Sequence, residues 1–264
     1  MSHLQDITQT LKTVAEAIDQ AERILFITGA GISADSGLPT YRGVGGLYQG
    51  QFTEEGISIE EALSGLMLIR RPDLTWKYLW QIGAACHGAR ANRAHEIIAL
   101  LQQRKPNTWV LTQNVDGLHR AAGTINLIEV HGHAFDLYCT QCSAKFSAEE
   151  LIRNYEAKPE LPPKCPQCGG LVRPDVVLFG ERLSDKTVAG LIDLSYMYPD
   201  LVIAIGTSGS FPYILRPIME AGYLGVPTVE INPDETYASD IVTYRVRLRA
   251  AEAMERIWAL LRQD

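Results

Sequence analysis

The 264-residue sequence has no long apolar run, no excess of basic charge and no recognisable leader. A membrane span needs about 20 consecutive apolar residues, and no stretch approaches that length. The net charge of −7 argues against a general grip on nucleic-acid phosphates, which needs a basic face. Its first residues lack the basic flank and apolar stretch of a secretory signal. We therefore expect a cytoplasmic protein that binds neither nucleic acid nor a membrane.

Cysteine is also scarce, and four of the five cysteines form two C-x-x-C pairs, Cys139 with Cys142 and Cys165 with Cys168. Disulfides seldom persist in the cytosol. Two such pairs supply four thiolates, which close the tetrahedral shell of a structural Zn²⁺ ion. A redox dithiol or four ordinary cysteines are the alternatives. The sequence around the two pairs lacks apolar periodicity, which favours a zinc site over both alternatives. The fifth cysteine, Cys86, is interpreted as a buried small side chain.

Apolar runs that alternate with helical patterns predict an α/β fold, a doubly wound and mostly parallel Rossmann-like sheet with a small zinc-ribbon domain inserted. Expected strands are 24–28, 109–112, 127–130, 176–179, 200–205, 228–231 and 244–249, and the principal helices are 4–21, 76–85, 94–103, 186–197, 212–221 and 250–261. We assign 1–134 and 172–264 to the large domain and 135–171 to the zinc domain. Part of 43–85 is expected to form a helical or cofactor-loop module beside it.

A glycine-rich loop follows the first expected strand and reads GAGISADSGLPTYRG from Gly29 to Gly43. Glycines at a strand end let main-chain N–H groups approach a diphosphate, and the helix that follows adds its positive dipole end. A dehydrogenase would carry a carboxylate at the end of its second strand, about twenty residues later. This chain has none in a strand there, so a dinucleotide would bind in another manner. A tight turn without a ligand is the alternative.

Polar residues collect after the strand at 109–112, in the sequence TQNVDGLH. Gln113, Asn114 and Asp116 are costly to bury without partners, and the ribose and carboxamide of a cofactor would supply them. His131 follows the strand at 127–130, where an imidazole with a pKa near neutrality can act as a general base. A polar turn and a structural histidine are the alternatives. His133 is assigned no chemistry.

Seven motifs in order resemble the sirtuins, the NAD-dependent protein lysine deacylases. They are GAGISADSGLPTYRG, TQNVDGLH, HG, the paired C-x-x-C, RPDVVLFGE, GTS and EINPDET, and the likeness runs from about Ile24 to Trp258. The resemblance implies NAD as co-substrate, a structural zinc ion and an acyl-lysine protein or peptide as partner. It leaves the oligomeric state open.

The resemblance also assigns roles to individual positions. His131 and Asn114 are implied as catalytic, and Val177, Phe179, Gly180 and Glu181 as the strand that binds the peptide by β-augmentation. Asp116 and Ile32 are implied to hold the nicotinamide carboxamide. The full set of implied NAD contacts is Gly29, Ala30, Gly31, Ile32, Ser33, Tyr41, Arg42, Gln113, Asn114, Asp116, Gly206, Thr207, Ser208 and Asn232.

The implied reaction has two steps. The acyl-lysine carbonyl oxygen attacks the nicotinamide ribose and releases nicotinamide. His131 then draws a proton from a ribose hydroxyl, which attacks the acyl carbon and leaves free lysine and O-acyl-ADP-ribose. Protein ADP-ribosyl transfer, NAD hydrolysis or a non-catalytic NAD-binding module are the alternative functions.

Three departures from the family pattern bear on specificity. Thr40 and Tyr41 stand where Asp and Phe are usual, and Gly209–Tyr213 is unlike the usual segment after GTS. Members that remove succinyl or malonyl groups carry a Tyr-x-x-Arg pair, whose positions Leu79 and Ile82 occupy in our alignment. An unpaired acyl carboxylate would be costly to bury there, so we predict an acetyl or longer apolar acyl group. The alternative is that the helix is misaligned and Leu79 only packs in the core.

Overall fold

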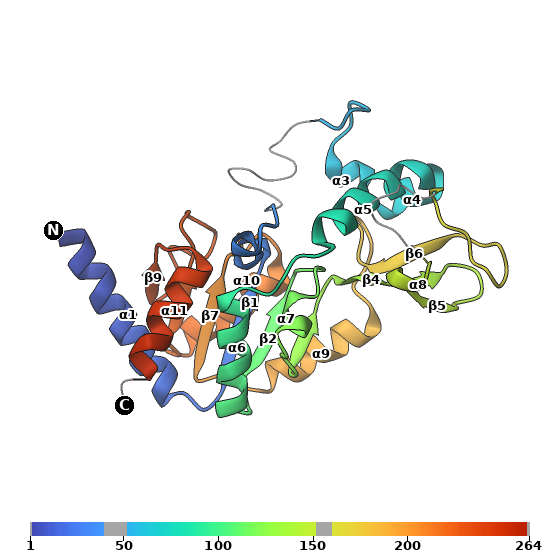
Figure 1. Ribbon diagram of the computed structural model, residues 1–264. Helices are drawn as coiled ribbons and strands as arrows, with labels where there is room; N and C mark the ends of the chain where they lie inside the picture. The colour runs from blue at the N-terminus through green and yellow to red at the C-terminus, as the bar shows by residue number, and fades with distance from the viewer. Residues whose placement is uncertain (1, 40–51, 152–159, 263–264) are drawn as a thin grey trace.

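The computed structural model describes residues 2–39, 52–151 and 160–262. Two units are visible in Figure 1: a large sheet flanked by helices, with both termini at its outer side, and a smaller sheet at the opposite end of the molecule. The predictions for Thr40, Tyr41 and Arg42 lie outside the described residues.

Six parallel strands form the large sheet in the order β3-β2-β1-β7-β8-β9. Each neighbouring pair runs parallel. The strands are β1 (Ile24–Thr28), β2 (Trp109–Thr112), β3 (Leu127–Glu129), β7 (Leu201–Ile205), β8 (Thr228–Ile231) and β9 (Tyr244–Val246). The doubly wound α/β class predicted from the sequence is confirmed.

Helices cover both faces of this sheet, which explains the uninterrupted apolar strand β1. Successive side chains of a strand point to opposite faces. Ile24 and Phe26 accordingly enter the core beneath α1 (Ser2–Gln20), α6 (Arg93–Arg104) and α11 (Ala250–Leu261). Leu25 and Ile27 enter the core on the other face, beneath α9 (Asp185–Ser195) and α10 (Pro212–Tyr223). None of the described helices is long and apolar enough to cross a membrane.

The smaller unit is an antiparallel sheet in the order β5-β4-β6 with its own core. Its strands are β4 (Gly132–Cys139), β5 (Lys145–Ser147) and β6 (Val172–Val176), and α8 (Ala148–Leu151) follows β5. The helices α3 (Ile59–Ala62), α4 (Gly65–Arg70) and α5 (Pro72–Cys86) contribute to the same core (Figure 1). The buried Trp76 indole of α5 donates to the Val172 carbonyl oxygen at 2.9 Å. We call this unit the small lobe.

The strand order of the large sheet reverses between β1 and β7. In an open α/β sheet, ligands bind beyond the carboxyl ends of the strands at such a reversal. The loop with α2 (Ala30–Ser33) and the short helix Ala34–Ser36 follows β1, and the Gly206–Ser208 loop follows β7. Both predicted phosphate loops therefore lie at the position where the fold favours a ligand.

Candidate active site

The loops after β1 and β7 pack directly against each other. The Gly31 N–H donates to the Gly206 carbonyl oxygen at 2.8 Å. A Cβ on Gly31 would lie 2.6 Å from Gly206 Cα, and one on Gly29 would lie 2.8 Å from the Gly206 oxygen. Gly206 itself has a φ of +59°, in the left-handed region. Close packing of the two loops therefore accounts for glycine at these positions, independently of any approach to a phosphate.

A hydrogen-bonded network joins the polar residues after β2 to both loops. The Asn114 amide donates to the Gly29 carbonyl oxygen and to Ser33 Oγ, each at 3.1 Å. Ser33 Oγ donates to Asp116 Oδ2 at 2.7 Å. Gln113 Nε2 donates to Thr207 Oγ1 at 2.6 Å. Residues that lie far apart in the sequence thus form one polar surface of hydroxyl, amide and carboxylate groups, which suits sugar hydroxyls and a carboxamide.

Ile32 lies next to this network, and its main-chain N–H donates to the Gly29 carbonyl oxygen at 3.1 Å. Its side chain is fully buried in the core of the large sheet. Its carbonyl oxygen accepts the Asn92 amide at 2.7 Å, and the same amide donates to Ser36 Oγ at 2.9 Å. Asn92 also caps α6, since its side chain accepts the Ala94 N–H at 3.0 Å. Asn92 was not among the predicted site residues, although an asparagine just before a helix is a capping signal.

His131 lies beside this network and has a partner on each ring nitrogen. Nδ1 lies 3.0 Å from the Gln113 carbonyl oxygen, which can only accept, so Nδ1 carries the proton of the neutral ring. Nε2 then presents a lone pair, and the Tyr213 hydroxyl lies 2.8 Å from it. Burial lowers the pKa of His131 below its usual value, despite the bond to the Gln113 carbonyl. The imidazole is therefore neutral near pH 7 and able to accept a proton.

Gly132 gives His131 its position. Its φ is +83°, and a Cβ there would lie 1.9 Å from the Asp175 carbonyl oxygen of β6. The chain therefore crosses from β3 of the large sheet into β4 of the small lobe at a point that only glycine fits. His133, to which we assigned no chemistry, packs its ring against Gly117, where a Cβ would lie 2.5 Å from Nε2, and its Nδ1 lies 3.4 Å from Asp136 Oδ1.

Two further histidines lie behind the polar surface, within the core. His119 Nε2 hydrogen-bonds the Thr28 hydroxyl at 2.9 Å, and the His95 and His119 rings meet edge to face at 4.8 Å. Burial lowers the pKa of His119 to about 3 and that of His95 to about 4. His119 Nδ1 and His95 Nε2 are buried without a hydrogen-bond partner. Both rings are neutral and structural at ordinary pH, and neither was among the predicted site residues.

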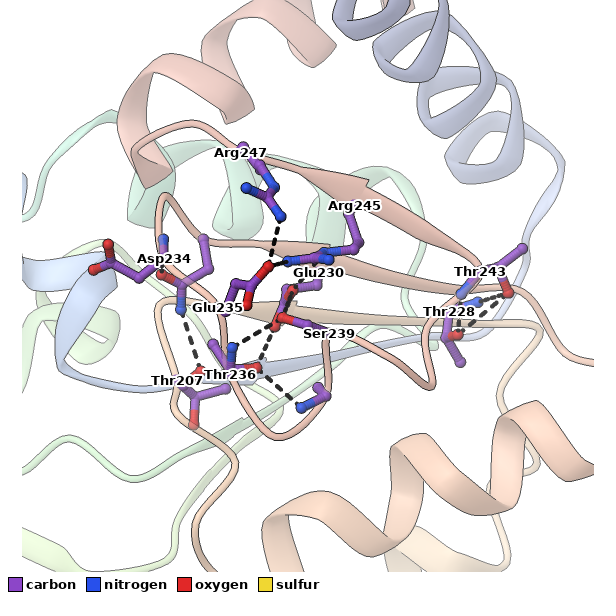
Figure 2. A network of polar contacts seen from close by, with 12 residues as sticks. Thr207, Thr228, Glu230, Asp234, Glu235, Thr236, Ser239, Thr243, Arg245 and Arg247 are labelled. Atoms are coloured by element: carbon purple, nitrogen blue, oxygen red, sulfur yellow. Dashed lines mark hydrogen bonds and ion pairs between the residues drawn. The ribbon is translucent and has the colours of Figure 1, made fainter.

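The EINPDET segment is held by Glu230, a buried carboxylate in β8 (Figure 2). Glu230 accepts hydrogen bonds from the Thr236 and Ser239 hydroxyls, and the Arg245 guanidinium lies 3.5 Å away. The Asn232 amide donates to the Thr207 carbonyl oxygen at 3.3 Å. This bond joins the loop after β8 to the loop after β7. Ser208, which is exposed, hydrogen-bonds Ser210 at 2.7 Å between the hydroxyl oxygens.

The predicted peptide strand differs from the structure in its position and partners. The strand β6 covers Val172–Val176 and ends where the expected strand 176–179 begins. Phe179 already pairs with the chain before α4, because its N–H donates to Leu63 O and its carbonyl accepts Gly65 N–H, each at 3.0 Å. The Val177 N–H donates to the His131 carbonyl oxygen at 2.9 Å. This segment links His131 to the small lobe.

Glu181 also has a partner that the sequence analysis missed. Its two carboxylate oxygens accept Arg173 Nη1 and Nη2 at 2.6 and 2.9 Å, and the Arg173 side chain is only 8% exposed. Burial raises the pKa of the Glu181 carboxyl, but the Arg173 guanidinium outweighs burial, and the net pKa lies below the usual value. Glu181 therefore anchors residues 176–181 to β6 through its carboxylate.

Leu79 and Ile82, the two residues aligned with the acyl-recognition pair, are partly buried on α5. Both pack against the core of the small lobe. This packing agrees with the alternative in which Leu79 and Ile82 are core residues. The residues around them in this core are apolar.

The four paired cysteines meet in the small lobe. Their sulfur atoms all lie within 4.8 Å of one another, with Cys139 and Cys168 at 3.5 Å and Cys142 and Cys165 at 3.7 Å. Sulfurs about 2.3 Å from a tetrahedral zinc ion lie about 3.8 Å apart, whereas a disulfide needs about 2.05 Å. The donor set and spacing fit a closed structural Zn²⁺ site.

The model of the Sir2 family matches residues 29–211, more than half of the chain. The chain belongs to the Sir2 family. It is 49% identical over 255 residues to NAD-dependent protein deacylase 2 of Pseudomonas aeruginosa, covering 96% of this chain and 97% of the relative. It is 38% identical to the NAD-dependent protein deacylase of Aeropyrum pernix, covering 92% and 96% of the two chains.

Solved Sir2 structures agree with this sirtuin in fold over nearly its whole length. A Sir2 homologue in complex with NAD has a TM-score of 0.80 at 32% identity and covers 95% of this chain and 94% of its own. A Sir2 structure with a deacetylated p53 peptide and 3′-O-acetyl ADP-ribose has a TM-score of 0.83 at 28% identity and covers 94% and 97%. The family predicted from the motifs is thereby confirmed, as is the fold class.

Proposed function

We propose that this sirtuin is an NAD-dependent protein lysine deacylase that transfers the acyl group of a modified lysine to ADP-ribose and releases nicotinamide. The observation that carries the proposal is one polar surface at the carboxyl ends of β1, β2 and β7, where Ser33, Asn114 and Asp116 lie in one network and His131 presents a basic nitrogen beside it. The names of the relatives and the ligands of the solved Sir2 structures support the same chemistry.

The chain's own groups divide the work. NAD, when bound, supplies the ribose carbon that the acyl oxygen attacks and the hydroxyl that later takes the acyl group. Asp116 and Ile32 hold the carboxamide, and Gln113 and Asn114 orient the ribose. The residues that bind the diphosphate and the adenosine are Gly29, Ala30, Gly31, Ser33, Gly206, Thr207, Ser208 and Asn232. Tyr41 and Arg42 complete the predicted contacts. Because an acyl oxygen is a weak nucleophile, orientation supplies much of the rate enhancement.

His131 acts as the base of the second step. Its Nδ1–H is held by the Gln113 carbonyl oxygen, so its Nε2 is the atom that accepts the proton. Its lowered pKa keeps the ring neutral at the pH where it must accept that proton. We propose that the peptide lies along Val177 and Gly180, beside the main-chain link from Val177 to His131.

Cys139, Cys142, Cys165 and Cys168 would hold a Zn²⁺ ion that stabilises the small lobe. Four protein ligands leave no open position on a tetrahedral ion, so the metal supplies folding energy and takes no part in the reaction. Because thiolates of this kind are kept reduced in the cytosol, we also propose a cytoplasmic location.

The proposed acyl preference is acetyl or a longer apolar chain. Leu79 and Ile82 offer no cation to an acyl carboxylate and pack among apolar residues. Turnover of an acetyl-lysine peptide should exceed that of the matched succinyl-lysine peptide at least tenfold, measured as kcat/KM. Equal or faster turnover of the succinyl peptide would refute this preference without touching the deacylase assignment.

The reaction itself is tested by the masses of its products. Incubation with NAD and an acetyl-lysine peptide should yield nicotinamide, the free-lysine peptide and O-acetyl-ADP-ribose in equal amounts. Free or protein-linked ADP-ribose with the peptide unchanged would instead support NAD hydrolysis or ADP-ribosyl transfer. If NAD remained unchanged, the result would instead support a non-catalytic NAD-binding module.

A further inference from the structure

Tyr213 lies where the proposed reaction needs an open nitrogen. The neutral His131 ring has one lone pair, on Nε2, and the Tyr213 hydroxyl lies 2.8 Å from that atom. Since Nδ1 is committed to the Gln113 carbonyl oxygen, Tyr213 donates its proton to Nε2. A ribose hydroxyl cannot donate to the same lone pair while Tyr213 does.

Aromatic packing holds the Tyr213 hydroxyl in this position. Its ring stacks on Phe211, with centroids 5.4 Å apart and planes 15° from parallel. Phe211 in turn meets the His131 ring edge to face at 5.4 Å. The three rings contact one another, so the hydroxyl would leave Nε2 only if the stack with Phe211 were broken as well.

The backbone adds to this restraint. Tyr213 lies in the first turn of α10, after Pro212 at the helix start. The Phe211 carbonyl oxygen accepts the N–H groups of Ile214 and Leu215, each at 3.0 Å, which closes that turn around Tyr213. The side chain is half-buried, and burial raises the pKa of Tyr213. The phenol therefore keeps the proton that it would pass on.

We propose that Tyr213 is a catalytic residue that relays the proton between the ribose hydroxyl and His131. In this step the sugar O–H bond breaks and a bond from that proton to Tyr213 Oη forms. At the same time the Tyr213 O–H bond breaks and the proton forms a bond to His131 Nε2. Tyr213 ends neutral, His131 ends as the imidazolium, and the sugar oxygen attacks the acyl carbon. The inference rests on the proposed function, with His131 as the base.

The test separates the two chemical steps in the variant Tyr213→Phe, which keeps the ring and the stack. Exchange of labelled nicotinamide into NAD, with acetyl-lysine peptide present, reports the first step. Formation of O-acetyl-ADP-ribose reports the second. We expect kcat for the second step to fall about 100-fold, the usual range for a lost acid–base group, while exchange stays within about twofold of the wild type.

Three matched variants make the result specific. Tyr196→Phe removes a hydroxyl from a 69% exposed tyrosine and should change neither step. Phe211→Leu removes the stack but keeps the Tyr213 hydroxyl, so it should slow the second step less than Tyr213→Phe does. His131→Ala should abolish the second step.

Each outcome has a defined meaning. If Tyr213→Phe retains the wild-type rate of acyl transfer, His131 takes the proton directly and the relay is wrong. Equal loss of exchange and acyl transfer also overturns it, since the hydroxyl would then be needed before the proton moves. If His131→Ala transfers the acyl group at the wild-type rate, the proposed base itself fails, which is a different failure from that of the relay.

Discussion

The large sheet and the small lobe reach a folded state by different physical means. The sheet buries apolar side chains on both faces, and the polar residues of the proposed site follow the carboxyl ends of its strands. The small lobe has a modest core, and to this it adds four converging cysteines and the buried ion pair of Arg173 with Glu181. The proposed site lies where the two units join, since His131 lies in the short link between β3 of the sheet and β4 of the lobe. The stability of the lobe should therefore govern the position of the base.

The largest expected effect comes from removing the metal ligands. In Cys139→Ala, or after chelation, we expect the small lobe to unfold, because zinc binding by such sites contributes about 10 kcal/mol or more of folding energy. Metal content and limited proteolysis measure this, with early cleavage expected within 132–176. Cys86→Ala is the matched control. It should retain the metal and its resistance to proteolysis, because Cys86 lies apart from the cysteine cluster.

A smaller effect is expected from breaking the ion pair that anchors the proposed peptide segment. Glu181→Gln leaves the Arg173 guanidinium buried without its charge partner and should lower the free energy of unfolding by about 3 kcal/mol. The exposed pair of Arg216 with Glu220 offers the control, since Glu220→Gln should cost less than about 1 kcal/mol. Chemical denaturation of the two variants measures both free energies of unfolding. Equal losses of stability in the two variants would contradict the anchoring role of Glu181.

A smaller, pH-dependent effect is expected from the neutral histidines of the sheet. An unfolded histidine takes up a proton near pH 6.5, whereas buried His119 does so only near pH 3. Between these values the unfolded chain binds more protons, so His119 contributes stability above pH 6.5 that is lost as the pH falls. The loss is up to about 1.4 kcal/mol per pH unit for each such histidine.

Thermal unfolding followed from pH 7 to pH 4.5 tests this. The variant His119→Gln should show a flatter dependence than the wild type, and His87→Gln, at an exposed position, should not. An unchanged slope in His119→Gln would show that His119 is not the group being titrated.

Much of the fold could be predicted because its signals are local. Strand β2 and helix α11 lie where their apolar patterns place them, at Trp109–Thr112 and Ala250–Leu261. The cysteine cluster could be predicted because C-x-x-C spacing fixes ligand geometry within a few residues. At the site, motif order indicated that Asn114, Asp116 and Ser33 belong together, and the structure joins them.

The rest depends on contacts between distant segments, which no local pattern reports. Phe179 pairs with Leu63 and Gly65, more than a hundred residues away. The helices α3–α5 share a core with the cysteine lobe, although they come before β2 in the chain. The Tyr213 hydroxyl reaches His131 across 82 positions of sequence. These contacts are products of tertiary packing, and they include the groups closest to the proposed chemistry.

We propose that His131 is the base that finally takes the proton of a sugar hydroxyl, and that it is not needed to hold NAD. The direct measurement is NAD affinity by calorimetry together with O-acetyl-ADP-ribose formation in His131→Ala. We predict affinity within about threefold of the wild type and no detectable acyl transfer. Acyl transfer at the wild-type rate, or loss of NAD binding in a folded variant, would contradict the account.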